Sequence, residues 1–158
     1  MFLIKKVMII ASSPNGDCFF EASMNSLKHI GISFESPEAV RRKFLSEENI
    51  RQFQKSNRVK AEELVSIVSC DMSSREQRRV KRVPTDNMTE CIHALSKLLC
   101  TYNEGPVIWV SGGIIAIVAY HLKHQGVKLR IARHEDSEPP NGREVVLLYQ
   151  ASHYESII

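Results

Sequence analysis

The spacing of apolar residues changes along this chain near Gly126. Most segments before that glycine repeat apolar residues every three or four positions, which is typical of helices with one buried face. Residues 127–131, directly after it, alternate apolar and polar side chains, which is typical of a half-buried strand. The sequence therefore predicts an α/β or α+β fold, with helices dominating the first two thirds and flanking one small central β-sheet.

The expected elements begin and end at recognisable cap and turn residues. Ser36 before Pro37 is a typical N-cap followed by a first-turn proline, and Gly31 and Gly126 are typical helix stops. The expected helices cover residues 18–29, 37–45, 47–53, 59–68, 88–100 and 112–122. The expected strands cover residues 3–4 with 7–10, then 107–110, 127–131, 145–149 and 153–158.

Length and composition favour one globular domain over residues 1–158, since 43% of the side chains are hydrophobic and 25% are charged. The longest stretch without a charge, residues 105–122, is shorter than the ~20 apolar residues of a membrane span. Lys5 and Lys6 interrupt the N-terminal apolar run before it reaches the length of a secretory signal. We therefore expect no membrane association. The four cysteines lack Cys-x-x-Cys spacing, which favours reduced thiols and a cytoplasmic location.

Cys18 is the candidate nucleophile because it follows a tight turn and opens a predicted helix. The unpaired amides and the positive end of a helix favour a thiolate, so this placement predicts a lowered pKa for the thiol. The main-chain amides of Asn15, Gly16, Asp17 and Cys18 could also stabilise the oxyanion of an acyl-transfer reaction. A buried structural cysteine is the alternative for Cys18, and a plain turn residue is the alternative for Asn15.

His153 is the candidate base. It begins the predicted terminal strand and is far from Cys18 in sequence, as catalytic histidines commonly are. Glu155 lies two residues further on and projects to the same face of a strand, where it could orient the imidazole. A strand histidine with an ordinary hydrogen bond and a solvated carboxylate are the alternatives for these two residues.

Both ends of the chain resemble the ovarian tumour (OTU) family of cysteine proteases. Residues 15–20, Asn-Gly-Asp-Cys-Phe-Phe, resemble the family's nucleophile motif, which usually reads Asp-Gly-Asn/Asp-Cys-Leu/Phe-Phe/Tyr. Residues 153–157, His-Tyr-Glu-Ser-Ile, are similar to its C-terminal His-Tyr-Asn/Asp-Ser-Val. Trp109 with the glycine turn and helix after it resembles the family's middle block. The chain departs from the pattern at Asn15, at Glu21, where the family usually has arginine or histidine, and at Glu155.

The resemblance implies an OTU-like fold and a deubiquitinase that cleaves isopeptide bonds to ubiquitin or a ubiquitin-like protein. It implies Cys18 as nucleophile and His153 as base, with no cofactor and no metal. Viral and bacterial members of the family act inside host cells, so the host-cell cytoplasm is a second expected location. A catalytically silent OTU-like module that binds a modifier or an acidic partner is the alternative function. The sequence leaves the oligomeric state open.

Two further clusters are interpreted as structural. Cys91, His93 and Cys100 have no fourth ligand at a suitable spacing, and both cysteines fit an apolar helix face. The basic run at residues 75–82 is interpreted as a solvated, mobile segment. A nucleic-acid role for that run remains the weaker alternative, since a net charge of +3 does not by itself indicate nucleic acid.

Overall fold

The structure, a computed structural model, describes residues 7–102, 106–135 and 137–158. It is a mixed α+β fold, which confirms the predicted class. Two compact units divide the chain: one combines the described residues of Met1–Val40 with those of Leu122–Ile158, and the other is formed by Arg41–His121. The expectation of one OTU-like domain over residues 1–158 stays a prediction.

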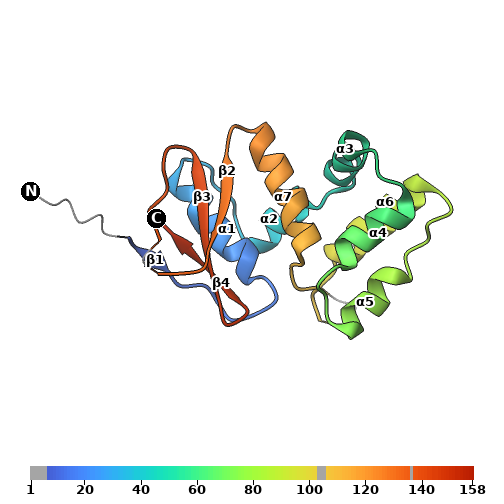
Figure 1. Cartoon of the computed structure of the whole chain (residues 1–158), viewed down its shortest axis with the longest axis horizontal. Coiled ribbons are helices and arrows are strands. Elements are labelled where there is room, and N and C mark those ends of the chain that lie inside the picture. Colours follow the sequence, from blue (N-terminus) through green and yellow to red (C-terminus); the bar gives the residue numbers. More distant parts are fainter. Residues whose placement is uncertain (1–6, 103–105, 136) are drawn as a thin grey trace, which may run out of the picture. The chain divides into compact units, whose positions relative to one another are not determined.

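The first unit contains a four-stranded sheet in the order β1-β4-β3-β2 (Figure 1). β4 pairs antiparallel with both β1 and β3, whereas β2 and β3 run parallel. The central strand β3 has five consecutive buried residues at its start, because side chains on both of its faces are covered. The strands are β1 (Ile9–Ile10), β2 (Lys128–Ala132), β3 (Glu144–Gln150) and β4 (His153–Ile157).

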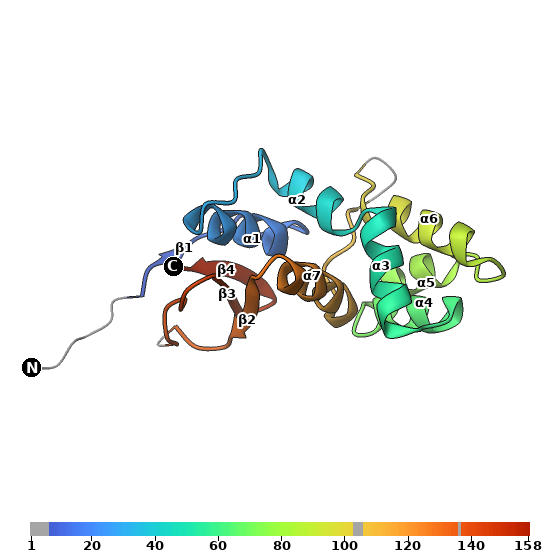
Figure 2. The same ribbon diagram turned by 90° about the horizontal axis from the view of Figure 1, so that it is seen from above.

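Helix α1 (Cys18–His29) packs against β4 and β3 and lies along one face of the sheet (Figure 2). Its buried side chains recur at helical spacing, and Phe19 meets Tyr154 of β4 edge to face, with ring centroids 5.1 Å apart. Tyr149 of β3 pairs with Tyr154 across the strands and brings its ring within 4.7 Å. These aromatic contacts fix α1, and with it Cys18, on β4.

The second unit is helical. Contacts join α3 to α6, α4 to α5 and α4 to α6. Arg41 is fully buried there. Its guanidinium donates a hydrogen bond to the Leu99 carbonyl at the end of α6, which offsets part of the cost of burying this charge. The helices beyond α1 are α2 (Pro37–Phe44), α3 (Glu47–Asn57), α4 (Ala61–Ser69), α5 (Ser74–Lys81), α6 (Met88–Leu99) and α7 (Gly112–His124), of which α2 and α7 cross the boundary between the units.

Most predicted elements are confirmed within a few residues, but two interpretations are wrong. Residues 107–110 form no strand. The Trp109 amide donates instead to the Glu76 carboxylate, 2.7 Å away, so a side chain takes the place of a neighbouring strand as its hydrogen-bond acceptor. Most of the basic run at residues 75–82, which we interpreted as a mobile segment, instead forms helix α5, which Ser73 caps. The apolar residues predicted at positions 3 and 4 lie outside the described residues.

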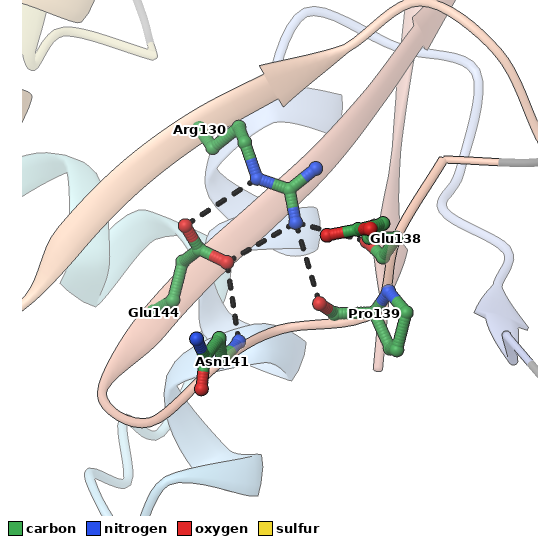
Figure 3. A network of polar contacts seen from close by, with 5 residues as sticks. All are labelled: Arg130, Glu138, Pro139, Asn141 and Glu144. Carbon is green, nitrogen blue, oxygen red and sulfur yellow. Dashed lines mark hydrogen bonds and ion pairs between the residues drawn. The ribbon is translucent and has the colours of Figure 1, made fainter. Parts of the chain in front are cut away.

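An ion pair between a half-buried arginine and a buried glutamate holds the connection between β2 and β3 (Figure 3). The Arg130 guanidinium lies 3.1 Å from the Glu144 carboxylate and also donates to the carbonyls of Glu138 and Pro139. The Asn141 amide donates to the same carboxylate. Burial alone would raise the pKa of Glu144, but the hydrogen bonds from Arg130 and Asn141 and the positive charge of Arg130 outweigh it and lower that pKa.

We expect Glu144→Gln to lower the free energy of unfolding at pH 7 by about 1–3 kcal/mol, because the substitution leaves Arg130 without its carboxylate. The folded-state pKa of Glu144 is lowered, so its contribution is complete above the unfolded-state pKa and disappears as pH falls through the folded value. Urea unfolding at pH 7 and in acid measures this difference. Glu62→Gln, at an exposed position of α4, is the control and should change stability by a few tenths of a kcal/mol.

Candidate functional site

Cys18 is the first residue of α1, as predicted, and its side chain is 1% exposed. The main-chain groups of Tyr154, Phe19 and Cys18 itself favour its thiolate, and the neighbouring Phe19 ring packs on Tyr154 with ring centroids 5.1 Å apart. Tyr154 directly follows His153 on β4. The fold therefore brings the two motifs from opposite ends of the sequence into contact at the start of α1.

The loop before Cys18 is held by its own hydrogen bonds. The Asp17 amide donates to the Asn15 side chain at 2.9 Å, and the Cys18 amide donates to the Asn15 carbonyl at 3.1 Å. The Asn15 amide donates to the Ser13 carbonyl, and the Glu21 carboxylate accepts from the Ser13 amide at 2.7 Å. In this conformation, therefore, the amides of Asn15, Asp17 and Cys18, which we expected to hold an oxyanion, stabilise the turn.

The prediction of a lowered pKa for the Cys18 thiol is wrong for this conformation. Burial raises the pKa, because removing a thiolate from water outweighs the main-chain groups of Tyr154, Phe19 and Cys18 that favour it. The negative charge of Glu21 raises the pKa further. The sequence indicated the helix terminus but left open whether the sulfur would be covered.

We expect Cys18 in the free protein to react with iodoacetamide at pH 8 at least about tenfold more slowly than Cys70, because Cys70 is exposed. The raised pKa leaves less thiolate at Cys18 at this pH, and burial limits access of the reagent. Mass spectrometry of peptides after timed alkylation measures both rates in one sample. Faster alkylation of Cys18 than of Cys70 would contradict the closed site described above.

His153 begins β4 directly after a two-residue hairpin turn. Gln150 and His153 are the closing pair, and both turn residues, Ala151 and Ser152, have positive φ angles of 52° and 61°. This is the backbone of a type I′ turn, in which glycine and asparagine are favoured. The turn fixes the register of β4 against β3 and therefore the position of the His153 main chain.

The His153 imidazole has an unusual environment. Its Nδ1 atom is buried and has no hydrogen-bond partner among the described residues. A buried polar nitrogen without a partner costs roughly 1–3 kcal/mol, so it needs an explanation other than stability. In this conformation neither Cys18 nor Glu155 forms a hydrogen bond with it.

Alternation along β4 places His153, Glu155 and Ile157 on one face, and Tyr154, which packs on α1, on the other. The prediction that His153 and Glu155 share a face is therefore confirmed. The Glu155 carboxylate forms no hydrogen bond with Nδ1 of His153. The role of Glu155 as the residue that orients the imidazole therefore stays a prediction. Asn15 is exposed and acts in the turn described above.

The interpretation of Cys91 as a core residue is confirmed, since it is fully buried on α6. His93 on the same helix is exposed and contacts the Glu47 carboxylate, and Cys100 is half-buried. Within residues 7–102, 106–135 and 137–158, no group of three metal-ligating side chains is positioned to hold an ion. None of the helices in this part of the chain has the length and hydrophobicity that crossing a bilayer requires.

Comparison with known proteins identifies no relative of this chain. Searches with protein-family models, with curated proteins and with solved structures find no match for this chain. The assignment of a function therefore depends on the residues around Cys18 and His153 and on the resemblance of their motifs.

Proposed function

We propose that this chain is an OTU-like cysteine-dependent isopeptidase that removes ubiquitin or a ubiquitin-like protein. The observation that carries the proposal is the packing of Phe19, next to Cys18, on Tyr154, next to His153, with ring centroids 5.1 Å apart. Acyl transfer through cysteine needs a thiol and a histidine that can reach it, and β4 carries His153 directly next to the residue that packs on α1. The unpartnered Nδ1 of His153 supports the same assignment, because it leaves a nitrogen available to accept a proton.

In the proposed reaction, His153 accepts the proton of the Cys18 thiol, and the sulfur attacks the carbonyl carbon of the modifier's terminal glycine. The new C–S bond forms as the isopeptide C–N bond breaks, and the imidazolium returns its proton to the leaving amine. Water then hydrolyses the thioester, which restores the thiol and releases the carboxylate. Binding of the modifier must uncover Cys18 and bring the His153 ring to it from the other face of β4, since Cys18 is buried and Nδ1 of His153 forms no hydrogen bond in the free protein.

A catalytically silent module is the second candidate, and three observations favour it. The Cys18 thiol is covered, its pKa is raised, and the amides of the preceding turn are engaged within that turn. Such a module would bind the modifier or an acidic partner through the same fold without turnover.

A ubiquitin probe with an electrophilic C-terminus separates the two candidates. We expect wild-type protein to form a covalent adduct with ubiquitin or with one of a panel of ubiquitin-like probes, and Cys18→Ala to form none. Cys70→Ser is the matched control: it removes an exposed thiol of the helical unit and should leave the adduct intact. Intact mass and peptide mapping identify the modified sulfur.

An adduct that persists in Cys18→Ala and disappears in Cys70→Ser would show adventitious labelling and contradict the proposal. Reversible binding of a modifier without any adduct would establish the silent module instead.

A further inference from the structure

The basic residues of α5 form one row. Arg75, Arg78, Arg79 and Arg82 are spaced at i, i+3, i+4 and i+7, which places them on a single face of the helix. Val80 lies on the opposite face and is fully buried. At a rise of 1.5 Å per residue, the row extends for about 10 Å along the helix.

Three of these guanidiniums point to solvent. Arg75, Arg78 and Arg82 are exposed, and within the part of the chain that the structure describes they form no hydrogen bond or ion pair. The one carboxylate on the helix, Glu76, is already engaged with the Trp109 amide. Three of the four arginines in the row therefore present positive charge that no acidic side chain of the described residues neutralises.

One end of the row opens onto a pocket of about 310 Å³ that contains an exposed tryptophan. Trp109 is 41% exposed, although tryptophan side chains normally bury most of their surface. Two hydrogen bonds fix the segment that carries it to α5: Glu76 accepts from the Trp109 amide at 2.7 Å, and Arg79 donates to the Pro106 carbonyl at 2.7 Å. The indole thus has a fixed position beside Arg75 and Arg79, which also line the pocket.

We propose that this surface, Trp109 with the arginine row of α5, binds single-stranded nucleic acid. An exposed indole provides a stacking platform for one unpaired base, and aligned guanidiniums bind successive phosphates, often through two hydrogen bonds each. The combination of aligned guanidiniums and one exposed indole matches the alternating phosphates and bases of a single strand. The site is a second activity, independent of Cys18 and of the proposed isopeptidase.

The choice of side chains supports phosphate as the ligand. Four of the five basic residues at positions 75–82 are arginines, and the planar guanidinium matches a phosphate better than the ammonium of lysine does. A single-stranded ligand is required because the bases of a duplex are stacked on one another and cannot stack on the indole.

The chain contains one tryptophan, so tryptophan emission, excited where tyrosine does not absorb, reports on this site alone. We expect a uridine dodecamer and a thymidine dodecamer each to change the fluorescence of the full chain and to saturate. If each of the three exposed arginines neutralises one phosphate, the slope of log K against log salt should be about −2, at about −0.7 per phosphate contact. Replacing Trp109 with alanine should weaken binding of a labelled dodecamer, followed by anisotropy, about tenfold or more.

Arg78→Gln/Arg82→Gln is expected to reduce the magnitude of the salt slope by about 1.4, corresponding to two lost contacts. Lys55→Gln/Lys97→Gln is the matched control, because it removes the same charge from exposed positions of α3 and α6 and should leave the slope unchanged. Circular dichroism before titration shows that each variant is folded.

Three results would overturn the proposal: no saturable fluorescence change, equal loss in the two double variants, or equal affinity for a duplex of the same length. Equal affinity for polyglutamate would also overturn it and indicate an acidic protein partner. Cys18→Ala should bind the dodecamers as wild type does, so failure of this proposal and failure of the isopeptidase proposal are distinguishable.

Discussion

Replacing His153 with glutamine is expected to lower kcat/KM for a fluorogenic ubiquitin substrate by about 10²–10⁴-fold, the usual contribution of a general base. The same substitution should leave the free energy of unfolding within about 1 kcal/mol of wild type, because Nδ1 of this histidine forms no hydrogen bond in the folded protein. The combination separates a catalytic role from a structural one, which would reduce stability and activity together.

His134→Gln is the control for the His153 experiment. It removes an exposed histidine from the connection between β2 and β3, so both kcat/KM and stability should be unchanged. Unchanged turnover in His153→Gln would remove His153 from the mechanism. A large loss of stability with proportionate loss of activity would identify it as a structural residue of the hairpin.

Replacing Gly113 with alanine is expected to lower the free energy of unfolding by about 3 kcal/mol or more. A Cβ atom at this position would lie 1.9 Å from the carbonyl oxygen of Ile67 and 2.5 Å from its carbonyl carbon. Both of those atoms belong to the main chain of α4, so no side-chain rotation relieves the clash and the helices must move apart. Urea unfolding followed by circular dichroism measures the loss.

The neighbouring glycine provides a matched control for Gly113. A Cβ atom at Gly112 would meet only the Asp71 carboxylate, at an ordinary 3.4 Å. Gly112→Ala should therefore be neutral or stabilising by up to about 1 kcal/mol, since alanine is the better helix former. Equal stability of the two variants would contradict the close approach of α7 to α4.

Helix positions were predictable because their signals are local. Ser36 accepts a hydrogen bond from the Ala39 amide at 3.1 Å, as a serine N-cap before proline should. Helix α1 begins and ends at the predicted residues. The missed helix α5 had a local signal as well: Ser73 followed by Glu76 is a capping-box pattern, which the density of arginines obscured.

The strand predicted at residues 107–110 failed because a strand needs a neighbour. An apolar run such as this one is compatible with a strand, a buried coil or part of a helix, and periodicity alone does not separate them. Ile108 is fully buried here, but its segment belongs to a helical unit, where the side chains of Glu76 and Arg79 on α5 bind its main chain.

By itself, the sequence determined the mixed fold class, the caps and stops of most helices, and the identity of Cys18 and His153 as residues to examine. Only the tertiary structure decided that the two motifs meet, that the thiol is covered and its pKa raised, and that Trp109 lies beside a row of arginines. The physical reason is that caps and periodicity depend on residues within one or two turns of chain. Desolvation, orphaned nitrogens and exposed rings depend instead on atoms that are distant in sequence and adjacent in space.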